Sequence, residues 1–274
     1  MRSMRLALVT LLLQSAALAA PAMAAAPLVP HRAVYDLALD RASDRSGITG
    51  LTGRMVYEFN GSPCEGYTVK FRFVTQIDTS ENSRVTDQQT TTFEEGNGQS
   101  FSFVTKSFTD QSLDRELKGT AKMEADGLKV TIDKPEKENI ELARTQFPTQ
   151  HLVELIGKAN TGETFYETNL FDGSEDADKV MTTTVVLGKK TDARPGDPEL
   201  AVLDKLAGEK YWPVDIAYFD LASDGGEELP QYRISFKLHE NGLTRDLLMD
   251  YGDFSMKGKL VDLSVFDLPP QTCK

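Results

Sequence analysis

The chain has 274 residues, of which 40% are hydrophobic and 26% charged, and its formal net charge is −12. Nucleic acid and anionic membrane surfaces repel such an acidic chain, so neither is expected as a partner. After residue 24 no stretch reaches the about 20 apolar residues that a bilayer span needs, so the mature chain is expected to lack an integral membrane segment.

The N-terminus has the pattern of an export signal. Arg2 and Arg5 precede an apolar run at residues 6–13, and Ala22-Met23-Ala24 supplies a small-X-small exit. We predict a signal peptide over residues 1–24, with cleavage after Ala26 as the second choice. Residues 25–274 are then one exported domain, located in the periplasm.

Two cysteines remain in the exported chain, Cys64 and Cys273. An even count in an oxidising compartment favours a disulfide between them. The alternative is a reactive thiol at Cys64, which would need a reduced sulfur and an activating base.

Alternation of apolar and polar residues dominates the rest of the chain and predicts about thirteen to sixteen strands. Asp126-Gly127 and Asn241-Gly242 are hairpin turn signals. So many strands in one sheet must curl into a barrel, a spiral or a sandwich. The expected strands cover residues 33–39, 51–59, 67–73, 84–93, 101–105, 117–123, 128–132, 164–171, 180–187, 212–218, 232–238, 243–251 and 254–263.

One segment has helical spacing instead. Residues 148–159 place Leu152, Leu155 and Ile156 on one face, and Thr149 is a plausible N-cap. A lone amphipathic helix in a β-protein must bury its apolar face, and the concave side of the curved sheet is the natural place. Residues 200–206 are expected to form a second, short helix.

A helix lying on a curved sheet would leave an apolar groove that can accept an acyl chain or an apolar peptide. Such residues can also simply fill a core, which is the more common role of an apolar stripe. The candidate lining residues are Tyr67, Val69, Phe71, Phe73, Leu152, Leu155, Ile156 and Trp212.

Motifs for catalysis or metal binding are missing. The sequence has no nucleophile elbow, phosphate-binding loop or zinc-protease motif, and His31, His151 and His239 are far apart. Asp172, Asp176 and Asp178 could hold calcium, but their spacing does not match an EF-hand loop, and a solvated turn is favoured. No catalytic residue and no cofactor is expected.

Several short stretches together resemble the EipB family of alphaproteobacterial cell-envelope integrity proteins. The resemblance implies an open, spirally curved antiparallel sheet around a helix, similar to the lipoprotein carriers of the Lol system. It also implies a disulfide that falls on Cys64 and Cys273, a link to envelope integrity, and no established enzymatic activity. The stretches are residues 31–37, 171–174, 212–214 with 217–219, 228–230, 241–242 and 250–254.

These observations predict a non-enzymatic periplasmic protein that supports the envelope by binding a lipidic or apolar component in the groove. Its partner would be an envelope lipid, a lipoprotein or a periplasmic protein. A scaffold for another periplasmic or outer-membrane protein is the first alternative. A hydrolase acting on an envelope polymer ranks last, because no motif supports it.

Overall fold

The computed structural model describes residues 27–174, 176–220, 229–269 and 273, so the predicted signal peptide lies outside the described residues. Fourteen strands form one antiparallel sheet in the order β8-β7-β6-β5-β4-β3-β2-β1-β14-β13-β12-β11-β10-β9, which confirms the predicted fold class. The strands are β1 His31–Ala42, β2 Ile48–Ser62, β3 Gly66–Thr79, β4 Ser83–Glu94, β5 Ser100–Thr109, β6 Ser112–Glu124, β7 Gly127–Lys134, β8 Glu138–Leu142, β9 Phe165–Leu170, β10 Met181–Leu187, β11 Tyr211–Phe219, β12 Tyr232–His239, β13 Thr244–Asp250 and β14 Phe254–Val265.

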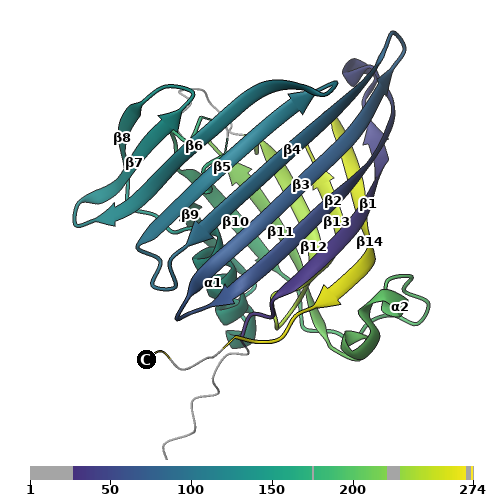
Figure 1. The fold of residues 1–274 in the computed structure, drawn as a ribbon. Helices are drawn as coiled ribbons and strands as arrows, with labels where there is room; N and C mark the ends of the chain where they lie inside the picture. The colour runs from purple at the N-terminus through teal and green to yellow at the C-terminus, as the bar shows by residue number, and fades with distance from the viewer. Residues whose placement is uncertain (1–26, 175, 221–228, 270–272, 274) are drawn as a thin grey trace, which may run out of the picture.

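The first strand pairs with the last one, and this pairing makes the sheet continuous. β1 lies antiparallel between β2 and β14, so the free edges are β8 and β9 in the middle of the sequence. In Figure 1 the sheet curls so that β2–β6 form the near wall and β9–β13 the far wall. Helix α1, Pro148–Thr161, follows β8, precedes β9 and lies inside the curl.

Aromatic side chains close the gap between the two halves. Phe147, just before α1, stacks on Phe101 of β5 with ring centroids 5.2 Å apart. Phe171, just after β9, contacts Phe103 of β5 edge to face at 6.0 Å. All four rings are buried, so they bury a large apolar area where the sheet edges approach each other.

A buried ion cluster fastens the segment after β10 to the sheet. The Arg245 guanidinium donates to Asp197 at 2.7 Å and to Glu199 at 3.1 Å. The second Glu199 oxygen accepts from the backbone N–H groups of Asp246 and Leu260, so this carboxylate lies between β13 and β14. Burial alone would raise the pKa of Asp197, but hydrogen bonds from Lys237 and Arg245 lower it to about 2.

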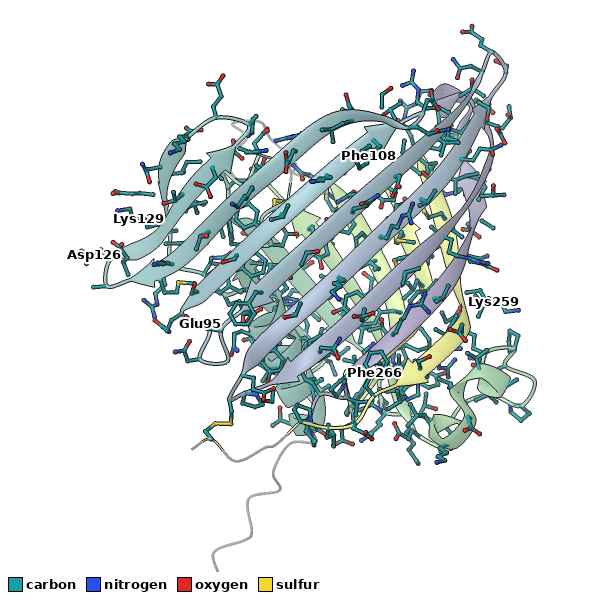
Figure 2. All side chains as sticks on the ribbon, viewed as in Figure 1. Glu95, Phe108, Asp126, Lys129, Lys259 and Phe266 are labelled. Carbon is teal, nitrogen blue, oxygen red and sulfur yellow. A yellow bond between two sulfur atoms is a disulfide. The ribbon has the colours of Figure 1, made fainter. Side chains whose placement is uncertain are left out.

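This segment includes the predicted short helix, which is α2, Leu200–Leu203, followed by a 3-10 turn, Asp204–Leu206. Figure 1 shows α2 at the lower right, outside the curl, and Figure 2 places Lys259 of β14 beside it. A surface cavity of 430 Å³ lies between residues 194–199 and the basic side chains of β12 and β14.

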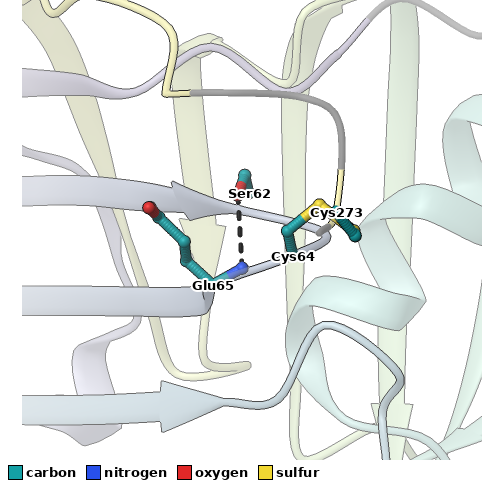
Figure 3. Close-up of a disulfide and its surroundings, with 4 residues drawn as sticks. All are labelled: Ser62, Cys64, Glu65 and Cys273. Atoms are coloured by element: carbon teal, nitrogen blue, oxygen red, sulfur yellow. Dashed lines mark hydrogen bonds between the residues drawn. A yellow bond between two sulfur atoms is a disulfide. The ribbon is translucent and has the colours of Figure 1, made fainter.

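The disulfide joins Cys64 to Cys273, with 5.1 Å between their Cα atoms, as predicted (Figure 3). Cys64 lies in the turn between β2 and β3, where the Ser62 hydroxyl accepts from the Glu65 backbone N–H. A Cβ atom at Gly96, in the β4–β5 turn, would collide with the Pro63 carbonyl, so this hairpin packs directly on its neighbour.

Candidate ligand cavity

A cavity of 280 Å³ lies inside the curl, between α1 and both walls of the sheet. Phe71 lines it from the near wall and Ile234 from the far wall, while His151 and Leu155 line it from the helix. This volume is just below the range of about 300–1,000 Å³ that is typical of small-molecule sites, so it suits a narrow ligand such as one extended apolar chain. Its lining is Tyr35, Met55, Tyr57, Phe71, His151, Leu152, Leu155, Ile216, Tyr218, Ile234, Phe236, Thr244, Leu247 and Met249.

The predicted lining residues divide between three places. Phe71, Leu152 and Leu155 line the cavity. Tyr67 and Ile156 line a second cavity of 310 Å³ beside the disulfide-bonded hairpin. Phe73 is half-buried against the apolar cluster of β1, β2, β13 and β14, and Val69 is half-buried on the same face of β3.

Trp212 lines neither cavity. It is 3% exposed and packs in the core cluster beneath α1. The far-wall residues Ile216, Ile234 and Met249 line the cavity although they were not among the candidates. Their alternation within strands was visible in the sequence. What the sequence did not show was that the curl brings these strands opposite β3.

The start of α1 is held by a side chain from the sheet. Thr149 was expected to be the N-cap, but the cap lies two residues earlier at Phe147, which makes no side-chain hydrogen bond, and the helix begins at Pro148. Instead, the Glu94 carboxylate of β4 accepts from the backbone N–H groups of Thr149 at 2.7 Å and Gln150 at 3.0 Å. Proline is favoured at the first helical position, and a carboxylate there complements the helix dipole.

Among the cavity-lining residues that come from α1, only His151 can titrate. Its Nε2 lies 3.3 Å from the Thr183 hydroxyl, which itself donates to the Thr168 carbonyl. Burial lowers the pKa of His151 to about 4, so the ring is neutral at physiological pH. Burial likewise raises the pKa of Tyr57 in the lining. The cavity is therefore uncharged.

In the described part of the acidic loop after β9, Asp172 and Asp176 have separate partners. Asp172 accepts from the Ser174 backbone N–H at 2.9 Å, and Asp176 forms an ion pair with Arg115 of β6. Within the described residues, no three His, Cys, Asp or Glu side chains are arranged to hold a metal ion. The solvated turn favoured over a calcium site for Asp172, Asp176 and Asp178 stays a prediction.

Stability is expected to depend on pH through the buried histidines. Burial lowers the pKa of His151 and of His239 to about 4, against about 6.5 in an unfolded chain. Below about pH 6.5 these histidines become protonated in the unfolded chain but stay neutral in the folded protein. The free energy of unfolding therefore falls as the pH falls toward about 4. Between about pH 7 and about pH 5 each histidine should remove about 2 kcal/mol from the free energy of unfolding, measured by urea denaturation.

The control for this prediction is His151→Gln, which keeps a polar partner for Thr183 but does not titrate. Its stability should fall less steeply over the same pH range. An unchanged slope would show that His151 is already charged or exposed in the folded protein.

The fold defines a β-barrel-like protein with an open sheet, an internal helix and an apolar cavity between them. No helix within the described ranges has the length and apolar character needed to cross a membrane. A model of the EipB-like family matches residues 22–267, so the chain belongs to this family.

Two comparisons with Brucella abortus agree with this assignment. The chain is 58% identical over 250 residues to the cell envelope integrity protein EipB of strain 2308, covering 91% of this chain and 88% of that protein. The second comparison is with a crystal structure of a β-barrel-like protein of a domain of unknown function. Its sequence is 57% identical to this chain, and the two structures superimpose with a TM-score of 0.85 over 89% of this chain and 100% of that chain.

Proposed function

We propose that this chain is a non-enzymatic periplasmic protein that supports envelope integrity by binding the apolar part of an envelope component inside its curved sheet. The observation that carries the proposal is the uncharged apolar cavity between α1 and the two walls. The name of the Brucella relative supports the envelope role. The N-terminal export pattern and the disulfide support the periplasm.

The cavity is tested by filling it. N-phenyl-1-naphthylamine, an uncharged apolar dye that fluoresces in apolar surroundings, should bind the wild-type protein. Leu152→Trp should weaken this binding at least about tenfold, because the larger ring occupies the cavity that Leu152 lines. Dye fluorescence titration measures the change, and circular dichroism confirms that the variant is folded.

The matched control is Leu113→Trp, which makes the same change at a position that is 55% exposed on β6. Its dye affinity should equal that of the wild type. Equal affinity of Leu152→Trp and wild type would place the dye elsewhere and count against the cavity as the binding site.

A scaffold role is the second candidate, and one surface feature favours it. Phe165 of β9 and Val186 of β10 pair directly across the strands and are both exposed. Adjacent exposed apolar side chains are typical of a contact with another protein. Co-purification of an envelope protein that Phe165→Ser releases, while dye binding stays intact, would favour the scaffold.

A further inference from the structure

The concave face of the near wall changes from apolar to polar across three neighbouring strands. Residues that pair directly on an antiparallel sheet share a face, with Cβ atoms about 4.5–5.5 Å apart. The side chains next to the apolar cavity are therefore hydroxyl and amide groups on the same surface. The two rows across β3, β4 and β5 are Phe71–Thr90–Thr105 and Phe73–Gln88–Ser107.

A polar cavity of 250 Å³ lies over these hydroxyl and amide groups. Gln88, Thr105 and Ser107 line it, together with Arg115 of β6 and Gly173 of the loop after β9. The positive charge of Arg115 is already neutralised by its ion pair with Asp176. An anionic head group would have to compete with that carboxylate, whereas an uncharged head group only needs hydrogen bonds.

The far wall carries a row of stacked aromatic rings on the inner face. Tyr218 lines the apolar cavity, and its ring lies 4.3 Å from that of Tyr232. Tyr232 is followed by Tyr251 at 5.9 Å and Tyr251 by Phe254 at 5.0 Å. Tyr251 is 40% exposed, so this end of the row is open to solvent.

The loop after β9 lies near both the aromatic row and the polar cavity. Burial, and to a smaller extent the nearby Asp172 carboxylate, raise the pKa of Tyr218 to about 12. The next residue, Gly173, lines the polar cavity. The loop therefore lines the polar cavity and lies near Tyr218.

These surfaces suit a sugar. The electron-rich face of an exposed aromatic ring, such as Tyr251 at the open end of the row, attracts C–H groups, and a saccharide ring presents C–H groups on its faces and hydroxyl groups at its edge. Serine, threonine and glutamine side chains can both donate and accept hydrogen bonds to such hydroxyls. The net charge of −12 adds a general repulsion of anionic ligands.

We propose that the bound component is an amphiphile with an uncharged, hydroxyl-rich saccharide head group, whose single apolar chain lies beside α1 while the head group lies between Gln88, Ser107 and the tyrosine row. This proposal rests on the proposed function, because it assumes that the apolar cavity holds the chain. It adds the chemical class of the ligand and its orientation.

The test compares amphiphiles of equal chain length that differ only in the head group. Dodecyl maltoside, dodecylphosphocholine and dodecyl sulfate are titrated below their micelle concentrations into the disulfide-bonded mature protein, and calorimetry gives each Kd. Dodecyl maltoside should bind at least about tenfold more tightly than dodecyl sulfate, because several hydrogen bonds distinguish the two.

The variant Gln88→Leu isolates the head group contact. Loss of this amide should weaken dodecyl maltoside roughly threefold to tenfold and leave dodecyl sulfate unchanged. Its matched control is Gln89→Leu, the same change on the opposite face of β4, where Gln89 pairs with Arg72. The control should leave both affinities unchanged.

The outcomes separate the two proposals. Equal binding of all three amphiphiles, or tighter binding of dodecyl sulfate, would overturn the saccharide proposal and leave the apolar cavity as a chain-binding site. An unchanged maltoside affinity in Gln88→Leu would overturn the proposed orientation and head group contact. If none of the amphiphiles binds, the proposed function fails and the saccharide proposal fails with it.

Discussion

Cys64→Ser is expected to lower the free energy of unfolding by up to about 5 kcal/mol. The disulfide joins residues 209 positions apart, and the chain-entropy model assigns about this value to so long a loop. It is an upper limit, because a collapsed unfolded chain already brings distant residues together. The bond also holds the C-terminal segment after β14 against the β2–β3 turn, so its loss should increase proteolysis at that end.

Cys273→Ser should match Cys64→Ser, and the double variant should be no less stable than either single variant, because all three lose the same bond. Urea denaturation measures the free energies, and limited proteolysis with mass spectrometry locates the cleavage. Labelling of two thiols per chain in denatured, unreduced protein from an oxidising periplasm would refute the bridge and reopen Cys64 as a reactive thiol.

Arg245→Met is expected to lower the free energy of unfolding by about 3–5 kcal/mol, the range found when one partner of a buried ion pair is removed. The substitution keeps an apolar stem but leaves Asp197 and Glu199 buried without their guanidinium partner. Glu199 would still accept from the backbone N–H groups of β13 and β14, but its buried negative charge would weaken the attachment of residues 194–207 to these strands. Urea denaturation at neutral pH measures the loss.

Arg54→Met is the matched control, because Arg54 makes a comparable ion pair with Asp36 on the exposed surface. An exposed pair contributes about 0–1 kcal/mol, so this variant should remain close to wild type. If Arg54→Met and Arg245→Met lose similar stability, the cluster around Glu199 does not fasten the segment as described.

Most strands were predictable because one face of each is buried and the other is not. β3 shows this most clearly, with Tyr67, Val69, Phe71 and Phe73 on the inner face. The edge strand β8 was missed, since it has only five residues and just two of them, Ile140 and Leu142, are apolar. A strand with one neighbour and little burial leaves a weak sequence pattern.

Contacts between distant segments were not predictable in this way. Glu94 looked like an ordinary strand residue, and only the curl of the sheet brings it to the start of α1. Arg245 interrupts the apolar alternation of Leu243 and Leu247, and the pairing of β12 with β13 shifts register there. The buried charge of Arg245 is tolerated there because the Asp197 and Glu199 carboxylates neutralise it.

The candidate lining was predicted only in part for the same reason. Helix periodicity grouped Leu152 with Leu155, strand periodicity selected Phe71, and all three line the cavity. Sequence hydrophobicity cannot tell a cavity wall from a filled core, so Trp212 was included although it packs beneath the helix. The polar rows of β4 and β5 were visible as threonine-rich strands, but their position beside Phe71 and Phe73 follows only from the pairing register.

The most direct test of the account is a crystal structure of the protein with an alkyl maltoside that carries a bromine atom at the end of its chain. Anomalous scattering locates the bromine independently of the rest of the ligand. The account predicts a bromine peak in the apolar cavity between Leu152 of α1 and Met249 of β13, with the sugar toward Gln88 and Tyr251. A peak on the outer face beside Phe165 and Val186, with the inner cavity unchanged, would contradict it.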